Sequence, residues 1–389
     1  MRTLVGLIVL VCGCVSQPID AGQPQPIDAG QPQPIDASQP QPIDAGQPID
    51  AGQPQPPCFG PPGLYADTLC STLATGVRMF TPHYRLWTDG AVKTRWVYLP
   101  HGGVIDAKDP DHWVYPVGTR LYKEFRSPDG LLRVETRMME KIKPGTDSGA
   151  WSYDTYVWSS DQLSVKAELN GVSNALGSGL NVPAKAQCLA CHNHSGSSRD
   201  MSMGFQAIQL NWEGAGVSLK ELIDTGVLVN YRQDILTAAV IPGRNVTETE
   251  AIGYLHANCG HCHTARVAQD GSAQYGFDAP HSMTLQTLVG FPLAQQPQWT
   301  TTVCVYPHTP YESRATQRIS GGNPKNSAIY NRDSVRGTDY PDAPIPAGAV
   351  PSPEVGGRPQ MPMLGTSKVD TDWLNLSARW INNITGCTP

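Results

Sequence analysis

Two things are scarce in this chain: long hydrophobic runs and an excess of charge of either sign. The 28 Lys and Arg residues stand against 34 Asp and Glu residues, a formal net charge of −6 over 389 residues. A membrane-spanning helix needs about 20 consecutive apolar residues, and no segment approaches that length. Attraction to nucleic acid or to an anionic membrane face requires a basic excess. The composition therefore favours neither a membrane-spanning protein nor a nucleic-acid-binding protein.

The first fourteen residues have the features of an export signal. Arg2 is followed by an apolar run over residues 4–11 and then by Gly13-Cys14, the order of charge, apolar core and small residue typical of a secretory signal. Residues 11–14 also resemble a bacterial lipobox, which would make Cys14 the lipidated first residue of the mature chain. Cys12 is unusual at its lipobox position, so secretion without a lipid stays open. Either route leads to an oxidising compartment, where disulfides persist.

Residues 15–57 form a proline-rich repeat. Ile-Asp-Ala units begin at Ile19, Ile27, Ile35, Ile43 and Ile49. Recurrent proline excludes a helix, and the few apolar residues cannot build a core. At about 3.1 Å per residue in polyproline II, the segment could span at most about 130 Å. It is predicted to be an extended tether that holds the rest of the chain off a membrane surface; repeat expansion without a function is the alternative.

The most informative motif occurs twice, as Cys188-Leu189-Ala190-Cys191-His192 and as Cys259-Gly260-His261-Cys262-His263. In C-x-x-C-H the two thiols bond covalently to one haem, and the adjacent histidine becomes its proximal iron ligand. A structural zinc site and a redox dithiol share the C-x-x-C spacing. Histidine is only 10 of 389 residues, so its presence after both motifs by chance has odds on the order of one in a thousand. The sequence therefore predicts two covalently bound haem c groups.

The remaining cysteines predict disulfides. Of 10 cysteines, two lie in the signal region and four in the motifs, which leaves Cys58, Cys70, Cys304 and Cys387. An even number in an oxidising compartment indicates two bridges, and three pairings are possible. We favour Cys58 with Cys70, which are close in sequence, and Cys304 with Cys387, which would hold the C-terminus to the body.

The chain after Cys58 is long enough for two domains. Residues 58–235 are expected to form a β-rich domain with the first haem, because short runs rich in Val, Tyr, Trp and Thr alternate with turn residues. These runs cover residues 94–99, 113–115, 120–125, 131–138 and 153–158, with a hairpin turn at 127–130. Residues 236–389 are expected to form a small helical domain with the second haem. A helix opened by a Thr247 capping box leads into Cys259, and another begins near Asp370. The predicted fold class is α+β.

A second axial ligand for the second haem is expected in the loop before the last helix. Residues 357–365 contain Met361 and Met363, and a thioether ligand raises the potential of a haem iron. The loop resembles the Met-Pro-x-Leu-Gly loop of class I cytochrome c domains, and residues 322–332 resemble the segment that precedes it there. The resemblance implies Met361 as the ligand. Met363 is the alternative, and core packing is the expected role of whichever methionine is not used.

A wider resemblance covers residues 75–385. Residues 84–91, Lys93, Arg95, Trp113, residues 116–125, 135–137 and 156–158, together with both motifs in this order, are similar to a bacterial family of exported di-haem c-type cytochromes. The β domain with the first motif also resembles, more weakly, the β-sheet cytochromes of the c′-beta kind. That second resemblance implies an open or weakly occupied distal side, which Lys123, Glu135 or Arg137 would line. Ordinary surface charges on the strands are the alternative for these three residues. If the first iron is six-coordinate instead, His194, Met201 or Met203 could be its second ligand, and core packing beside Phe205 is the alternative for Met203.

Two hypotheses follow. In the first, the chain is an exported, lipid-anchored di-haem cytochrome that passes single electrons between redox partner proteins of the cell envelope, facing the periplasm or the cell surface. In the second, it is a haem enzyme, with peroxidase or small nitrogen-oxide chemistry at an open first haem and the second haem as its electron relay. No catalytic dyad is evident from residue spacing, which favours the carrier and leaves enzymatic activity undecided. A gas or redox sensor is a third, weaker hypothesis.

Overall fold

The structure is a computed structural model, and it describes residues 57–146, 148–192, 202–263, 283–307, 315, 317–336, 361–362 and 365–389. The side chains of residues 148 and 189–191 are outside that description. The predicted signal with Cys14 and nearly all of the predicted tether also lie outside it. From Gln55 onward the chain forms one compact unit.

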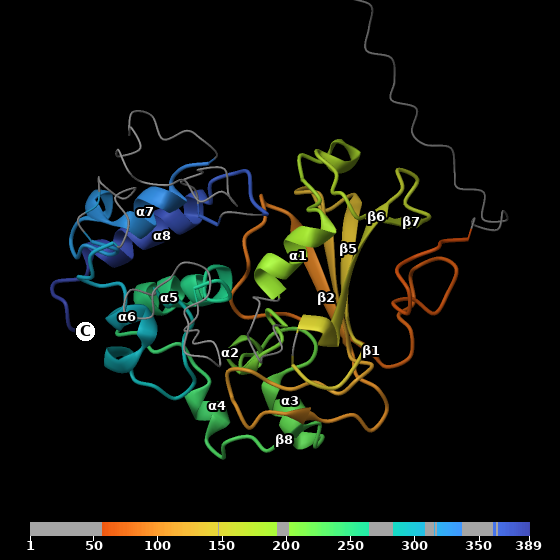
Figure 1. Ribbon diagram of the computed structural model, residues 1–389, viewed down its shortest axis with the longest axis horizontal. Helices are drawn as coiled ribbons and strands as arrows, with labels where there is room; N and C mark the ends of the chain where they lie inside the picture. The colour runs from red at the N-terminus through yellow and green to blue at the C-terminus, as the bar shows by residue number, and fades with distance from the viewer. Residues whose placement is uncertain are drawn as a thin grey trace, which may run out of the picture. The chain divides into compact units, whose positions relative to one another are not determined.

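The main element is a six-stranded antiparallel sheet in the order β1-β2-β4-β5-β6-β7 (Figure 1). Its strands are β1 (Val77–Phe80), β2 (Val92–Tyr98), β4 (Arg120–Arg126), β5 (Arg133–Lys141), β6 (Trp151–Trp158) and β7 (Val165–Ala167). A separate parallel pair joins β3 (Ile105–Asp106) to β8 (Leu228–Val229). Strands that are neighbours in this sheet also follow one another along the chain, apart from β3, which lies in the connection from β2 to β4. The sheet is therefore a meander. The predicted α+β class with an antiparallel sheet is confirmed.

Four of the expected strands match sheet strands, and one does not. Residues 113–115 contribute only a single bridge, between Val114 and Asp106. Trp113 and Tyr115 are instead buried by packing on the ring of Phe205, at 6.1 and 6.3 Å between centroids. Aromatic residues are favoured both in strands and in cores, so composition alone could not separate the two roles.

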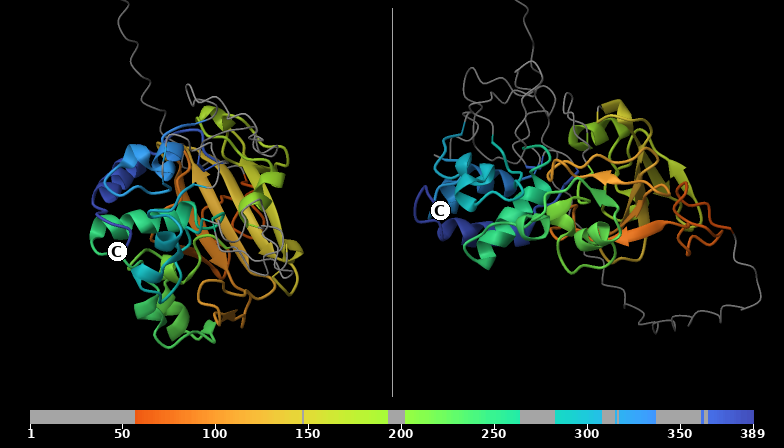
Figure 2. Two further views of the ribbon diagram at one scale, coloured as in Figure 1. Left: turned by 60° about the vertical axis from the view of Figure 1, so that its left-hand side comes forward. Right: turned by 90° about the horizontal axis from the view of Figure 1, so that it is seen from below.

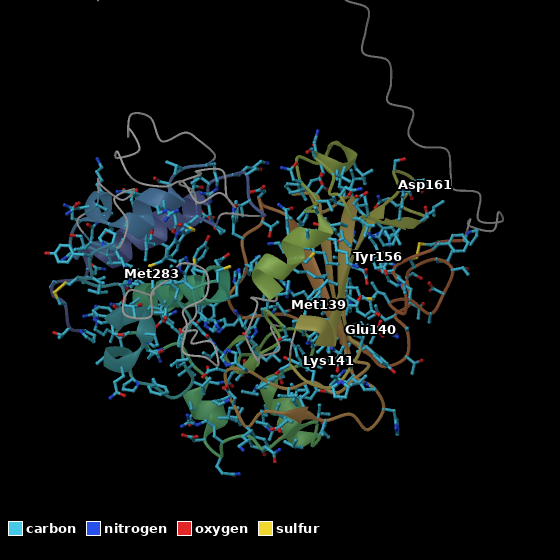
Figure 3. All side chains as sticks on the ribbon, in the orientation of Figure 1. Met139, Glu140, Lys141, Tyr156, Asp161 and Met283 are labelled. Atoms are coloured by element: carbon cyan, nitrogen blue, oxygen red, sulfur yellow. A yellow bond between two sulfur atoms is a disulfide. The ribbon has the colours of Figure 1, made fainter. Side chains whose placement is uncertain are left out.

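The two faces of the sheet are covered by different parts of the chain. On one face, Trp96, Tyr122 and Met138 pack against Leu64 and neighbouring residues of the N-terminal segment. The opposite face contributes a larger core that includes Met139 and faces the helices. Figure 2 shows the helices on one side of the sheet and the red-orange N-terminal segment on the other, and Figure 3 labels Met139 and Tyr156, one residue from each face.

The helices are α1 (Lys185–His192), α2 (Ala207–Leu210), α3 (Leu219–Asp224), α4 (Ile235–Ala238), α5 (Val246–Asn258), α6 (Pro297–Thr300), α7 (Ala328–Asp333) and α8 (Thr371–Asn382). Short 3-10 turns cover Ser148–Ala150, Ala175–Gly177, Leu293–Gln295 and Pro324–Asn326. None of the helices that the structure describes has the length and hydropathy needed to cross a bilayer.

Side-chain caps set the starts of the two longest helices. Asp370 caps α8 by accepting from the backbone N–H of Trp373 at 3.0 Å, as its position predicted. The predicted capping box at Thr247 is wrong, because Asn245 caps α5 and accepts from the N–H of Glu248. Asn245 precedes the box by two residues and provides an equally good acceptor, so the spacing of Thr247 and Glu250 was coincidental. Both helices still begin within two residues of the predicted positions.

One continuous core passes through both of the expected domains. It joins sheet residues such as Val97 and Leu121 to α5 residues such as Leu255 and to Trp380 of α8. Residues 84–91 connect the two regions directly. The backbone N–H of Trp87 donates to the Asn258 side chain at 2.6 Å, immediately before the second motif.

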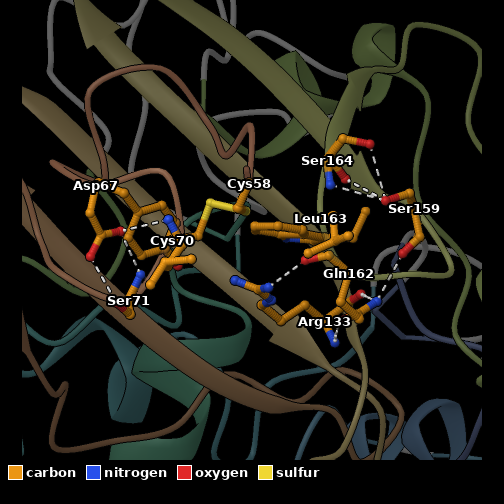
Figure 4. The surroundings of a disulfide bond; sticks show 12 residues. Cys58, Asp67, Cys70, Ser71, Arg133, Ser159, Gln162, Leu163 and Ser164 are labelled. Carbon is orange, nitrogen blue, oxygen red and sulfur yellow. Dashed lines mark hydrogen bonds between the residues drawn. A yellow bond between two sulfur atoms is a disulfide. The ribbon is translucent and has the colours of Figure 1, made fainter. Parts of the chain in front are cut away.

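The first disulfide joins Cys58 to Cys70, with an S–S distance of 2.02 Å (Figure 4). The pair lies in a small cluster with the buried ring of Trp158, on which the Arg133 guanidinium stacks at 3.7 Å from the ring centroid. Within the same loop the carboxylate of Asp67 accepts backbone N–H groups of two following residues. The bridge thus holds a short N-terminal loop on the edge of the sheet.

The second disulfide joins Cys304 to Cys387 across 83 residues. The carbonyl of Cys387 also accepts from the indole N–H of Trp299 at 3.0 Å. Both bridges are the pairs that the sequence analysis favoured. Closing a long loop removes many conformations from the unfolded chain, so this bridge is the one expected to stabilise the fold more.

Candidate haem-binding sites

The second motif begins where α5 ends. Cys259 is the C-cap of the helix, and the chain then makes a tight turn in which the N–H groups of Cys262 and His263 both donate to the Cys259 carbonyl, at 3.1 and 2.8 Å. The backbone of Cys259, Cys262 and His263 thus lies within a single turn. This is the local geometry that attachment of one planar group through two thioethers and one ligand requires.

Residues 283–287 lie along this turn. The N–H of Leu285 donates to the His263 carbonyl at 2.6 Å, and the N–H of Thr287 donates to Nδ1 of His256 at 3.1 Å. Gly260 permits the approach, since a Cβ there would lie 2.9 Å from the Cα of Gln286. The His256 ring is therefore held against residues 283–287 and does not face solvent freely. Burial lowers its pKa to about 4.

The His263 imidazole is buried and neutral. It hydrogen-bonds the backbone carbonyl of Met283, while burial first and the positive charge of Arg332 second lower its pKa to about 4. An imidazole that donates one N–H to a carbonyl presents its lone pair on the other nitrogen, which is the tautomer that ligates metals. The lowered pKa leaves the ring neutral at neutral pH, the state in which an imidazole can ligate a metal.

Met361 is hydrogen-bonded to α7. Its backbone N–H donates to the carbonyl of Arg332 at 3.1 Å, and its side chain is half-buried. The positive charge of the same Arg332 is one cause of the lowered pKa of His263. Met363, the alternative ligand, is outside the described residues.

The segment after Met361 is held by the sheet region. The buried carboxylate of Asp89 accepts the backbone N–H groups of Ser367 and Lys368 and the Ser367 hydroxyl, at 2.7 to 2.9 Å. The indole of Trp87 donates to the Lys368 carbonyl at 3.2 Å. Sequence reasoning did not identify Asp89 as a site residue, because its partners are 278 residues away along the chain.

The first motif lies on α1, over the sheet. Lys185 at the start of α1 pairs with Asp154 of β6 at 2.9 Å. At its end, the His192 ring lies 5.6 Å from the Tyr153 ring, and the Tyr153 hydroxyl donates to the His192 carbonyl at 3.3 Å. Cys188 is half-buried against the main core. The side chain of Cys191, and all of His194 and Met201, are outside the described residues, and Met203 is half-buried.

Haem attachment and a structural zinc site make different demands on these residues, since zinc takes four ligands with its cysteines as thiolates. Among the described residues no three His, Cys, Asp or Glu side chains gather as metal ligands. Burial, with a smaller contribution from Asp333, raises the pKa of the Cys259 thiol well above its usual range.

No family model, curated protein or solved structure matches this chain. The case for a haem protein therefore stands on the chain's own residues. The two motifs have unlike surroundings: the second lies among helices beside a methionine loop, and the first lies over a β-sheet.

Proposed function

We propose that this protein is an exported di-haem c-type cytochrome that passes single electrons between redox partner proteins of the cell envelope. The observation that carries the proposal is the pair of C-x-x-C-H motifs, in the second of which the imidazole of His263 is buried, neutral and hydrogen-bonded to a backbone carbonyl. The lipobox with Cys14 and the proline-rich tether support attachment to a membrane by a lipid alone.

The bound haems would supply the one-electron chemistry. The chain's own residues do three things at the second site. Cys259 and Cys262 would hold the group covalently, His263 would supply an imidazole nitrogen to its iron, and Met361 would supply a thioether. The buried surroundings of His263 would exclude water from the group, which favours a high potential.

The first test is the mass of the purified, exported protein. Mass spectrometry should show the polypeptide plus two covalent haems, and the alkaline pyridine haemochrome should give the band of a thioether-bonded haem at two per chain. A Cys259→Ala and Cys262→Ala double variant should retain one haem. Protein that lacks covalent haem after expression with a haem-attachment system would disprove the proposal.

A second candidate function is a haem enzyme with an open first haem. It is favoured by the sheet face near α1, which presents the charged side chains of Arg95, Lys123 and Arg137 beside its apolar residues. Carbon monoxide separates the two. If both irons hold strong protein ligands, the reduced spectrum does not change, whereas a shift in about half of the haem indicates an open first iron.

A further inference from the structure

A row of cations crosses the sheet on the face that α1 covers. Arg95 of β2 pairs with Lys123 of β4, Lys123 pairs with Arg137 of β5, and Arg137 pairs with Thr155 of β6. Directly paired residues of antiparallel strands point to the same face. These four residues, called the cationic row below, therefore lie side by side. Lys93 lies on the same face, two residues along β2.

The cationic row has little negative charge to balance it. Glu135 pairs with Arg137 at 2.6 Å. Arg95 is only 8% exposed, and among the residues that the structure describes no acceptor lies within hydrogen-bonding distance of the side chains of Arg95 or Lys123. Lys123 lies over the ring of Phe125, 4.9 Å from its centroid, so Arg95 is the buried cation of the row. Taking a charge out of water without a partner costs several kcal/mol, and an anion against Arg95 would offset that cost.

The other charged groups nearby do not remove the imbalance. Arg85 adds a further positive charge beside Arg95, and Asp370 at the start of α8 acts on Lys93. Burial, followed by the neighbouring cations, lowers the pKa of Lys93 to about 7 and that of Lys123 well below its ordinary value. A lowered pKa favours the neutral amine, so the positive charge of this face comes mainly from Arg95, and an anion placed against the two lysines would favour their protonated form.

The cationic row also lies next to the first motif. The adjacent row on the same face is apolar and consists of Val97, Leu121, Met139 and Tyr153. Tyr153 in that row contacts His192, so the cationic row begins about 7 Å further along β6, one strand repeat of two residues. Thr155 at its end is 2% exposed, and its hydroxyl has no hydrogen-bond partner in the described part of the chain.

We propose that the cationic row is a binding site for a carboxylate or small oxyanion, and that the carboxylates of the haem on the first motif are its ligand. The inference rests on the proposed function. A haem is an apolar ring with two carboxylates on one edge, and the face offers an apolar row followed by a cationic one. Arg95 brings a planar guanidinium group of the kind that binds carboxylates bidentately, whereas the guanidinium of Arg137 is already held by Glu135. A free oxyanion such as sulfite or nitrite has the same chemistry and is the other possible source.

Redox titration of Arg95→Gln and Lys123→Met tests the proposal on full-length protein whose mass shows both haems. Loss of a cation favours the ferric state, so at a fixed potential the ferrous-to-ferric ratio of the first haem should fall about tenfold, a shift of about 59 mV for one electron. Lys166→Met, an exposed lysine on β7, is the matched control and should titrate as wild type. Arg95→Lys keeps the positive charge and should titrate close to wild type. The two haems are told apart by the charge-transfer band between methionine and ferric iron, which is expected from the second haem only.

Added anions identify the source. If haem carboxylates occupy the row, sulfite, nitrite and phosphate leave the wild-type spectrum unchanged. If a free oxyanion does, one of them shifts the spectrum saturably in wild type and not in Lys123→Met. Variants that titrate as wild type, with no anion effect, overturn the inference. Protein without haem disproves the proposed function instead, and the row is then tested by whether the same anions raise the melting temperature of wild type but not of Lys123→Met.

Discussion

His263 and Met361 are 98 residues apart along the chain, and Arg332 of α7 acts on both. The backbone N–H of Met361 donates to the carbonyl of Arg332, and the charge of Arg332 lowers the pKa of His263. In the proposed function both would ligate one iron, so each can be tested separately.

Replacing Met361 by Ala should remove one low-spin haem signal. The thioether is a weak ligand that protein structure must supply, so its loss should convert one haem of two to high spin and abolish the near-infrared charge-transfer band between methionine and ferric iron. Absorption and electron paramagnetic resonance spectra measure this. Met363→Ala should leave both signals unchanged; the reverse result would assign the ligand to Met363.

Asp333 should make stability depend on pH. It is 6% exposed, it accepts from the Trp373 indole at 2.6 Å, and burial raises its pKa to about 7. The unfolded chain releases this proton near pH 4. Between about pH 4 and pH 7 the folded state therefore holds a proton that the unfolded state has lost, and stability falls as the pH rises through that window.

Asp333→Asn should remove this component of the pH dependence. The wild-type free energy of unfolding should fall relative to that of the variant by up to about 1.4 kcal/mol per pH unit between pH 4 and 7. Above pH 7 the difference should become constant. Urea unfolding at several pH values measures it, and parallel curves for the two proteins would show that Asp333 is ionised throughout.

At the scale of elements, the segment from Met361 to α8 depends on a carboxylate from the sheet region. Asp89 is 5% exposed and accepts N–H groups of Ser367 and Lys368 with both oxygens. The chain thus anchors its predicted ligand loop at Arg332 on one side and at Asp89 on the other. Neither anchor belongs to the loop itself.

Asp89→Asn should loosen the methionine loop. Hydrogen bonds to a charged acceptor are each worth about 1.5–3 kcal/mol, and an amide has only one acceptor oxygen. We expect a loss of about 2 kcal/mol in global stability and loss of the methionine band at a lower urea concentration than in wild type. Asp67→Asn is the control, because Asp67 accepts backbone N–H groups in the N-terminal loop; it should leave the methionine band unchanged. Equal effects of both variants on that band would remove the anchoring role of Asp89.

At the scale of the whole molecule, sheet and helices share one core rather than forming separate bodies. Gly253 on α5 shows how close the contact is, since a Cβ there would lie 2.0 Å from the ring of Tyr84. Tyr254, the next residue, stacks on Trp373 of α8 at 4.1 Å. Tight packing of this kind transmits disruption from one region to the other.

Gly253→Ala should therefore destabilise the entire unit. Overpacking of a filled core costs about 1–3 kcal/mol, and we expect a loss in that range in the free energy of unfolding, with tryptophan fluorescence and haem absorbance changing together as two-state behaviour requires. Gly386→Ala is the control, since a Cβ there meets nothing within 4 Å. Separate transitions for the two probes would indicate that the sheet and helical regions unfold independently.

Local sequence patterns predicted the elements better than their boundaries or connections. The strands over β2, β4, β5 and β6 and the helices α5 and α8 follow from residue periodicity and turn chemistry. The short strands β1 and β7 were missed because three or four residues carry too little periodicity. Residues 113–115 were assigned to a strand wrongly, because aromatic residues look alike in a strand and in a core.

The sequence alone predicts the chemistry of the two sites, because the motif that carries the prediction is local: two thiols and an imidazole lie within five residues, whatever the fold. The cysteine count likewise limited the disulfides to a few pairings. Only the tertiary structure decided that Asp89 holds a loop 278 residues away, that the Met283 carbonyl supports His263, and that Arg95, Lys123 and Arg137 share one face. Those relations depend on strand register and on long-range packing, in which residues far apart along the chain become neighbours only once the core closes.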